Sequence, residues 1–561
     1  MANITISPSN PHERILSAKR ITRIVFIGLL LDILSFTIIL PLLPRSLEAY
    51  KAREGSDPTT LLGSALRWVG VLREYILRNS HGGPLGPSSS RFLQQGARAD
   101  MVLLGGLLGS LYSLLQCVVA PVIGRAADRF GRRRTLMVCM GGNILWTVIW
   151  IFAGSFETFL VARIIAGLSE GNVQLSNTII ADVTDPQTRS HGMALVGIAF
   201  AVGFTLGPSI GAYFAQLSPD FLLVQSKALS ANVLEYAPFA MAAVFSLVLL
   251  VVECVYLFVR LPETLHYVAR STSSGNARQK TTTTSTPAAT NSPHALLRRL
   301  NYLHFAYLFF FSGMEYTLTF LTHDKFGFTN AQQGKLLGFI GITSTLIQGG
   351  YVRRIKNKSK TEQRPDDQKK KETQVKTRDK SLVSQGMVGC AVGLLCIALC
   401  CIKIDQSKQE DSNEAAASVA AQRWLWAGAL GLALASATVV NCLNSLVSLV
   451  ASNNNSASTG SNSRGGGGGG GDNGNDIGRR LGDFRSAGQI GRALGPMFAC
   501  SVYWLSGAST CYMVGSIAVL LVSLVFIATV PAVLAPTTSL SSRAFVAADA
   551  PEKDVISKKH N

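Results

Sequence analysis

The chain has 561 residues, of which 48% are hydrophobic and 15% are charged. Its mean hydropathy of +0.28 argues against an ordinary soluble chain of this length, which would divide into several domains with polar faces on every helix. Apolar residues instead collect in segments of about twenty, the length that crosses a hydrocarbon core. The formal net charge of +19 would suit nucleic acid, but the basic residues lie in the loops between these segments. This distribution favours a membrane surface and no nucleic-acid partner.

The ten cysteines and the N-terminus give no sign of a secreted disulfide protein. Nearly all the cysteines lie inside apolar segments, and their spacing fits neither a disulfide framework nor a metal site. Residues 1–20 are polar and lack a signal peptide's apolar core and cleavage site, so the first apolar segment is expected to direct membrane insertion. No P-loop or nucleophile triad stands out. We therefore expect a protein that is not an enzyme, with no metal and no cofactor.

Twelve apolar segments are predicted to cross the membrane as helices, because lipid offers no partner for backbone polar groups. The predicted fold class is all-α and multi-pass transmembrane, with twelve helices in two pseudo-symmetric six-helix bundles. The predicted spans are 21–43, 101–123, 135–153, 157–179, 191–213, 238–259, 303–322, 332–352, 381–402, 423–450, 486–506 and 511–534.

An even number of spans puts both termini on one side of the membrane. Lys and Arg are enriched in the loops of that side, which predicts that both termini are cytoplasmic. The expected domains are a cytoplasmic tail (1–20), an N-terminal bundle (21–259) with a long extracytoplasmic loop (44–100), a cytoplasmic linker (260–302), a C-terminal bundle (303–534) and a cytoplasmic tail (535–561).

Three cytoplasmic stretches, 271–293, 353–380 and 451–476, have low sequence complexity. Such sequences cannot bury enough apolar surface to order themselves. The basic stretch 353–380 is expected to meet anionic lipid, and a specific partner is the less favoured alternative.

The two halves carry similar features at equivalent positions. Asp32 and Glu315 each place an acid on the first span of a half. Transporters built from two such halves hold the substrate site between them at mid-depth. A second shared feature, on the fifth span of each half, is the small-residue pattern Gly203, Gly207, Pro208 and Gly211, matched by Gly491, Gly495 and Pro496.

A dense charge cluster occupies the turn between the second and third spans, Gly124-Arg125-Ala126-Ala127-Asp128-Arg129-Phe130-Gly131-Arg132-Arg133-Arg134. A cytoplasmic stop-transfer loop would explain the arginines, but not an acid and two glycines at these spacings. The pattern G-x-x-x-D-R-x-G-R-R-R resembles the signature loop of the major facilitator superfamily of secondary transporters.

The resemblance implies a conformational latch on the cytoplasmic side. Gly124 would let the end of the second span approach the eleventh. Asp128 would pair with an arginine of the loop and face a helix N-terminus, where a negative charge is favoured. The latch residues it implies are Gly124, Asp128, Arg129, Gly131 and Arg132.

The pattern Gly203–Gly211 is similar to the fifth-span motif of the superfamily's drug:proton antiporters, with Ala212 where that motif ends in glycine. Small residues four apart allow close helix packing, and Gly-Pro bends a helix. Generic packing would explain a single pair of glycines. The whole pattern on the expected span favours the antiporter type.

Charges inside spans cost several kcal/mol, roughly, and are functional candidates by default. Arg163 lies in a segment similar to the family's fourth-span arginine motif, which is linked to proton coupling or anion binding, although Ala166 replaces the motif's glutamine. Glu170 follows two helical turns later, on roughly the same face. It is expected either to function in transport or to neutralise Arg163.

The buried acids are candidates for carrying protons, because a low dielectric favours the neutral form of a carboxyl. We expect a function for Asp32 and Glu315, and a structural hydrogen bond for Glu253. The substrate and proton-coupling candidates are Asp32, Arg163, Glu170 and Glu315.

Several further segments, among them 261–265 and 311–318, resemble the tetracycline-transporter-like group of the superfamily. The resemblance implies a small-molecule organic ion substrate, with organic anions or drug-like amphipathic molecules expected. It also implies proton-linked antiport by alternating access, in a monomer of the plasma membrane or an internal membrane such as the nuclear envelope. The alternatives are a non-transporting receptor or scaffold on the same fold, and a uniporter.

Overall fold

The computed structural model describes residues 11–39, 42–79, 97–214, 240–265, 293–328, 330–352, 368–407, 414–458 and 477–530. Within these ranges the chain is helical, with short turns and no strand. The N-terminal half comprises α1 (Pro11–Ile39), α2 (Leu43–Glu54), α3 (Leu61–Asn79), α5 (Ala97–Phe130), α6 (Arg132–Ile151), α7 (Phe156–Ser169), α8 (Asn172–Val183), α9 (Pro186–Phe214) and α12 (Ala240–Arg260). The C-terminal half comprises α14 (Pro293–Phe326), α15 (Asn330–Leu346), the π-helix η2 (Ile347–Val352), α17 (Gln368–Ser407), α18 (Glu414–Ser458), α19 (Ile477–Ser506) and α20 (Ala508–Thr529).

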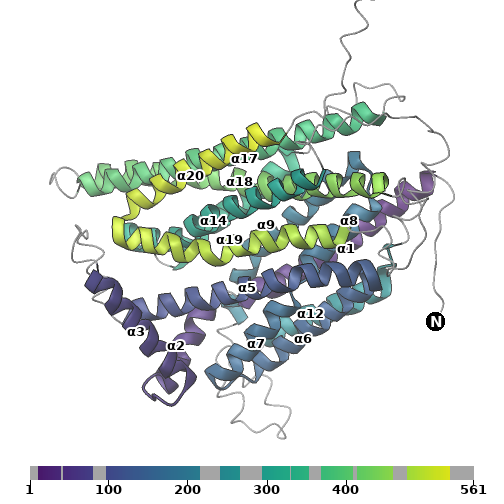
Figure 1. Ribbon diagram of the computed structural model, residues 1–561. Helices are drawn as coiled ribbons and strands as arrows, with labels where there is room; N and C mark the ends of the chain where they lie inside the picture. Colours follow the sequence, from purple (N-terminus) through teal and green to yellow (C-terminus); the bar gives the residue numbers. More distant parts are fainter. Residues whose placement is uncertain are drawn as a thin grey trace, which may run out of the picture.

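The helices run side by side, as expected for a multi-pass bundle (Figure 1). α17 and α20 lie along one side of the molecule, and α6, α7 and α12 lie along the other. α5 and α19 pack together where the two halves meet. We call the end of the bundle where α5 ends and α19 begins the Asp128 end; it is on the right in Figure 1.

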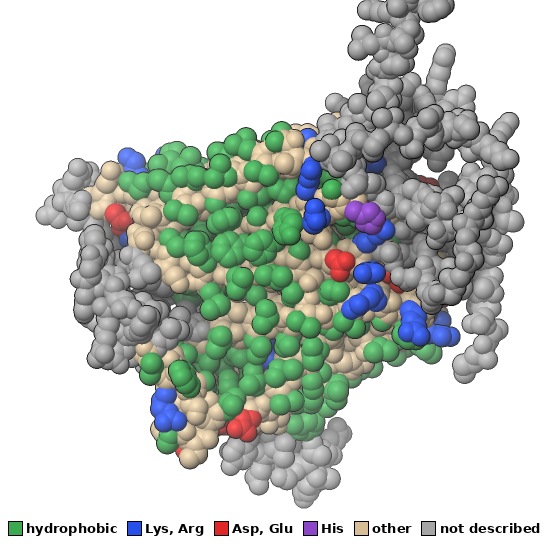
Figure 2. All heavy atoms as spheres, in the orientation of Figure 1, with side chains coloured by type: hydrophobic (Ala, Val, Ile, Leu, Met, Phe, Trp, Pro, Cys, Tyr) green, Lys and Arg blue, Asp and Glu red, His purple; other side chains and the backbone are tan. Residues whose placement is uncertain are grey.

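The outer surface has the polarity of a membrane protein. Apolar side chains cover the middle of the face seen in Figure 2, whereas Lys and Arg gather toward the Asp128 end. Large apolar side chains stay exposed on this surface; Val138 of α6 is 75% exposed and Val259 of α12 is 69% exposed. A soluble protein would not leave so many uncovered.

Seven helices among the described residues are long and apolar enough to cross a membrane, within α1, α5, α6, α12, α17, α18 and α20. Helices also cover the other predicted spans, and several of these are interrupted or more polar. The predicted span 157–179 is divided into α7 and α8, and α15 gives way to η2 at Ile347. α19 carries charged residues along its length.

Two helices, α2 and α3, lie almost entirely within the predicted extracytoplasmic loop 44–100. α2 begins at Leu43, with Pro44 in its first turn, where proline's missing N–H costs nothing. The Tyr50 hydroxyl donates a hydrogen bond to the carbonyl oxygen of Ala153 at 2.7 Å. The Glu54 carboxylate accepts from the backbone N–H of Phe156, the first residue of α7, at 3.3 Å. These contacts attach α2 to the α6–α7 turn.

The same helix pair packs closely in each half. Gly203 and Gly207 of α9 lie against α1, and the Thr37 hydroxyl donates to the Gly203 carbonyl at 3.0 Å. Gly211, also in α9, lies against the backbone of Ile38. In the C-terminal half Gly491 and Gly495 of α19 lie against the backbone of α14, with Pro496 inside α19 and Pro208 inside α9. A side chain at these glycines would force the helices apart.

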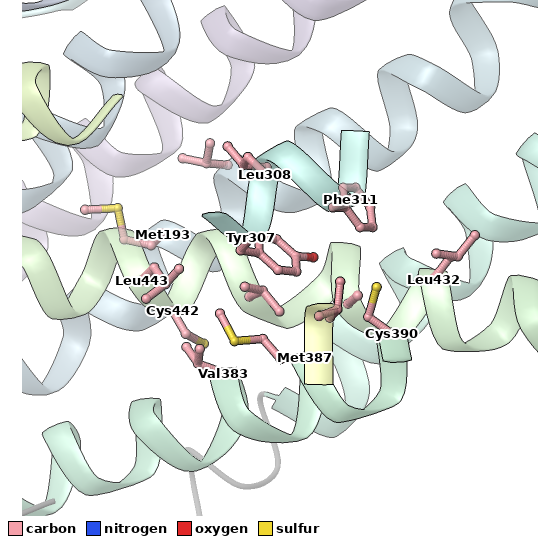
Figure 3. Packing of buried hydrophobic residues seen from close by; sticks show 14 of the residues in the cluster. Met193, Tyr307, Leu308, Phe311, Val383, Met387, Cys390, Leu432, Cys442 and Leu443 are labelled. Carbon is pink, nitrogen blue, oxygen red and sulfur yellow. The ribbon is translucent and has the colours of Figure 1, made fainter. Parts of the chain in front are cut away.

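The C-terminal half has a dense apolar core between α14, α17 and α18 (Figure 3). Tyr307 of α14 is completely buried, as are Met387 and Cys390 of α17. All ten cysteines are free thiols, as their spacing predicted. Such interdigitation gives each half a rigid interior that can move as a unit.

Candidate functional site

The interruption between α7 and α8 places polar groups in the interior. α7 ends at Ser169 and α8 begins at Asn172, so Glu170 and Gly171 lie between the two helices. Glu170 caps the end of α7, and both it and Arg163 lie beside Tyr112 of α5. A side chain at Gly171 would crowd the Cys139 sulfur, 2.8 Å from an added Cβ, so glycine suits this break. Irregular backbone at membrane depth is tolerated only where protein or a cavity surrounds it.

Asp32 of α1 lies beside the start of α8. It is 5% exposed, and its Oδ1 accepts a hydrogen bond from Nδ2 of Asn172 at 2.7 Å. The side chain of Asn143 in α6 also hydrogen-bonds to this carboxyl. The two donors, Asn172 and Asn143, are neutral and come from different helices. Three helices, α1, α6 and α8, therefore meet at Asp32.

Glu170 forms an ion pair that joins the two halves. Its Oε1 lies 3.7 Å from Nη2 of Arg485 in α19, and the Tyr112 hydroxyl of α5 donates a hydrogen bond to it. The side chains of Glu170 and Arg485 are only 13% and 16% exposed. The sequence leaves open whether Glu170 neutralises Arg163; in the structure its cationic partner is Arg485.

Arg163 is a buried cation without an acidic partner among the described residues. Its side chain is 6% exposed, and its guanidinium carbon lies 5.0 Å from the ring centroid of Tyr112. Its Nε has no hydrogen-bond partner. A cation–π contact is worth about 2 kcal/mol when desolvated, which is less than the cost of burying a charge. The site therefore carries positive charge that a bound anion would compensate.

Two further acids, Glu253 and Glu315, take no part in the Asp32–Asn172 hydrogen bond. Glu253 of α12 is 1% exposed, its Oε2 has no partner, and Asp32 and Glu170 are its charged neighbours. Glu315 is accessible although it lies well inside α14, and Arg492 of α19 is its charged neighbour. Glu315 is not among the charged neighbours of Asp32. Asp32 and Glu315 hold equivalent positions in the sequences of the two halves, but their surroundings in the structure differ.

The charged loop lies at the Asp128 end. Asp128 Oδ1 accepts from the backbone N–H of Gly478 at 3.1 Å, and its Oδ2 accepts from that of Arg479 at 2.8 Å. These amides belong to the first turn of α19, whose N–H groups have no partner inside the helix. Gly124 lies directly against the Gly478 carbonyl, so any side chain there would separate α5 from α19.

Arg132 continues the network through the N-terminal half. Its Nη1 lies 2.6 Å from Asp128 Oδ1, its Nε lies 2.8 Å from Asp182 Oδ2 of α8, and it is completely buried. Glu263, just after α12, accepts from the backbone N–H of Arg132 at 2.9 Å. Arg132 thereby connects the ends of α5, α8 and α12, and Asp128 connects this group to α19.

The two other predicted latch residues have different surroundings. Arg129 is exposed, and its guanidinium carbon lies 5.3 Å from the Phe130 ring centroid. Gly131 has a φ of 101°, a left-handed conformation that suits glycine, and precedes α6. The network itself uses Asp128 and Arg132.

Sequence reasoning missed four charged residues of this architecture, Arg485, Arg492, Asp182 and Glu263. Arg492 lies inside the predicted span 486–506, so the signal that singled out Arg163 was present. Arg485 lies one residue before that span, where its charge was taken for a loop. Asp182 lies near a helix end, where acids are common, and gave no distinguishing signal. Glu263 lies in the segment 261–265, whose resemblance to the family did not point to a role for this acid.

An all-α bundle with an apolar belt, ionisable side chains in its interior and a charged network at one end defines a multi-pass membrane protein of the transporter type. The chain belongs to the Major Facilitator Superfamily, whose family model matches residues 25–471. The predicted fold class and family are confirmed.

Similar proteins narrow the family further. The chain is 34% identical over 516 residues to mouse major facilitator superfamily domain-containing protein 10, covering 89% of this chain and 91% of that protein. A crystal structure of the human organic anion transporter MFSD10 (TETRAN) is 31% identical with a TM-score of 0.63, covering 91% of this chain and 99% of that one. A shorter stretch of 113 residues is 34% identical to the class E tetracycline resistance protein of Escherichia coli, covering 20% of this chain and 28% of that protein.

Proposed function

We propose that the chain transports organic anions across a membrane by alternating access, in proton-linked antiport. The observation that carries the proposal is Arg163, a buried guanidinium with no acidic partner among the described residues, beside Tyr112. An organic anion that entered the bundle would supply the missing negative charge. The similarity to a human protein named as an organic anion transporter supports the same substrate class.

Asp32 is the proposed proton carrier. It is buried, and its hydrogen-bond donors Asn172 and Asn143 are neutral amides rather than cations. Gain and loss of a proton at such a carboxyl changes the charge of the interior by one unit. Low effective dielectric makes that change felt at Arg163 and Arg485.

The proposed orientation puts the Asp128 end in the cytoplasm. Its exposed Lys and Arg support this, because basic residues accumulate on the cytoplasmic flank of membrane helices. There the basic loops would meet anionic lipid. We propose a monomer in the plasma membrane or an internal membrane such as the nuclear envelope.

The experiment is uptake of carboxyfluorescein, an organic anion, into proteoliposomes with and without an imposed pH gradient. We expect Arg163→Ala to lower uptake by about tenfold or more, because truncating a buried ion-pairing group costs about 2 kcal/mol or more. Arg163→Lys should retain part of it. Asp32→Asn should abolish the response to the pH gradient while leaving exchange of carboxyfluorescein at equilibrium.

Antiport requires faster uptake when the vesicle interior is the more acidic side, since protons then leave as the anion enters. Uptake that is indifferent to the gradient would indicate a uniporter. Full uptake in both variants would contradict the assignment of Arg163 and Asp32. If wild-type vesicles took up neither carboxyfluorescein nor any other anion of a panel of organic anions, the proposal itself would be contradicted.

A further inference from the structure

Arg485 has the features of a second anion-binding residue. With Arg492 it follows one face of α19, because positions seven apart return to the same side of a helix. Building on the proposed transport of organic anions, we propose that Arg485 binds the substrate's oxyanion group, and that Glu170 occupies that group's place in the substrate-free state. The ligand chemistry is a carboxylate or sulfonate on an apolar body.

The Glu170–Arg485 contact is poorly made for a permanent ion pair. A separation of 3.7 Å exceeds the 2.7–3.2 Å of a hydrogen bond to nitrogen, and it involves one nitrogen instead of the paired contacts a guanidinium can make. Nε of Arg485 is buried and has no partner. The guanidinium thus keeps donors that an incoming carboxylate would satisfy in bidentate fashion.

Arg485 shares its surroundings with Arg163. Tyr112 of α5 lies near the guanidinium groups of both arginines and hydrogen-bonds to Glu170. One cation therefore comes from α7 in the N-terminal half and the other from α19 in the C-terminal half. An anion held by both would bridge the halves, as Glu170 does without it.

Competition for one guanidinium makes a prediction that a structural bridge does not. Removing the charge of Glu170 removes the competitor and should strengthen substrate binding. Removing Arg485 removes the receptor and should weaken it. If the pair only held the halves together, loss of either partner would affect binding in the same direction.

The experiment is equilibrium binding of carboxyfluorescein to the purified full-length protein in detergent, followed by fluorescence anisotropy. We expect Glu170→Gln to bind about five- to tenfold more tightly than wild type. Arg485→Ala should bind at least about tenfold more weakly, and Arg485→Lys should lie between. The organic cation tetraphenylphosphonium serves as a competitor, and its apparent affinity should not rise in Glu170→Gln or fall in the Arg485 variants.

The matched control is Glu157→Gln, the same change on the same helix, at an exposed position in the first turn of α7. It should bind like wild type. Size-exclusion profiles and melting temperatures identify folded variants, and if Arg485→Ala fails to fold, Arg485→Lys carries the test. Weaker binding in Glu170→Gln, or wild-type binding in the folded Arg485 variants, would overturn the proposal. Transport by wild type together with either result would leave the proposed function standing and remove only this site.

Discussion

At the scale of single residues, the Asp128 carboxylate makes two kinds of contact. It accepts hydrogen bonds from the backbone N–H groups at the start of α19, and it forms an ion pair with the buried guanidinium of Arg132. The first contact joins the halves, whereas the second holds the carboxylate in place. Loss of the charge should therefore weaken closure at this end without touching the Asp32–Glu170 region.

We predict that Asp128→Asn slows transport about tenfold with little change in substrate affinity. Hydrogen bonds to a charged group are worth about 1.5–3 kcal/mol, and 1.4 kcal/mol corresponds to about tenfold in an equilibrium between closed and open states. Initial rates of carboxyfluorescein uptake over a range of concentrations separate the two quantities. Arg129→Gln, one position along and exposed, is the control and should transport normally. A wild-type rate in Asp128→Asn would show that the contact with α19 does not limit the cycle.

The sequence located several of the important charges but could not pair them. Asp32 and Arg163 stood out because charge inside an apolar segment is rare. The partner of Glu170 did not, because Arg485 is more than three hundred residues away along the chain. Spacing along one helix suggested Arg163 as a partner, but the ion pair of Glu170 is made across the halves with Arg485. Pairing across halves depends on tertiary structure alone.

At the scale of elements, α2 acts as a brace on the α6–α7 turn. The Tyr50 hydroxyl reaches the carbonyl of Ala153, which is completely buried, so no water can replace the hydrogen bond. Burial raises the pKa of Tyr50 to about 12 from an ordinary value near 10. A folded-state pKa above the unfolded one means that this stabilisation is fully present below pH 10 and is lost as the pH rises through 12.

We predict that Tyr50→Phe lowers the melting temperature by about 1–3 °C, because an unsatisfied buried carbonyl costs about 1–3 kcal/mol. The difference from wild type should be constant between pH 6 and 9, since Tyr50 stays protonated there. Transport should be unchanged, because the substitution removes only the hydroxyl and keeps the ring that packs against Phe159 of α7. Tyr302→Phe, the same change at a residue that is 67% exposed, is the control. An unchanged melting temperature in Tyr50→Phe would show that α2 does not brace the turn.

The elements that the sequence predicted well are those whose signal is continuous. Seven helices pass a test of length and apolarity alone. The signal is weaker in α7 and α8, which are interrupted at Glu170 and Gly171, and in α19, which carries charged residues along its length. α2 and α3 were missed for another reason. α2 is only 12 residues long, and α3 is amphipathic and carries charged residues, so neither has the continuous apolar run that predicts a span.

At the scale of the whole molecule, the contact between α5 and α19 runs from the Asp128 end into the bundle. The Ser486 hydroxyl donates to the Cys117 carbonyl at 2.8 Å, and the Ser110 hydroxyl donates to the Ala493 carbonyl at 2.8 Å. Across the other side of the interface, the Arg189 guanidinium of α9 donates to the Ser448 carbonyl of α18 at 3.0 Å. If transport proceeds by rocking of the halves, these contacts must break and re-form in every cycle.

Cys117 allows a direct test of that motion with one substitution. Its Sγ lies 3.2 Å from the Ser486 hydroxyl oxygen, so Ser486→Cys would place two thiols within reach of a disulfide between the halves. We predict that an oxidant abolishes carboxyfluorescein uptake in Ser486→Cys and that a reductant restores it, because the disulfide prevents α5 and α19 from separating. Ser486→Cys combined with Cys117→Ser should be insensitive to the oxidant, as should Ser486→Ala. Mass spectrometry of the cross-linked peptide confirms that the bond has formed. Undiminished uptake by fully cross-linked protein would mean that this interface stays closed throughout transport, and the rocking of two rigid halves would have to be abandoned.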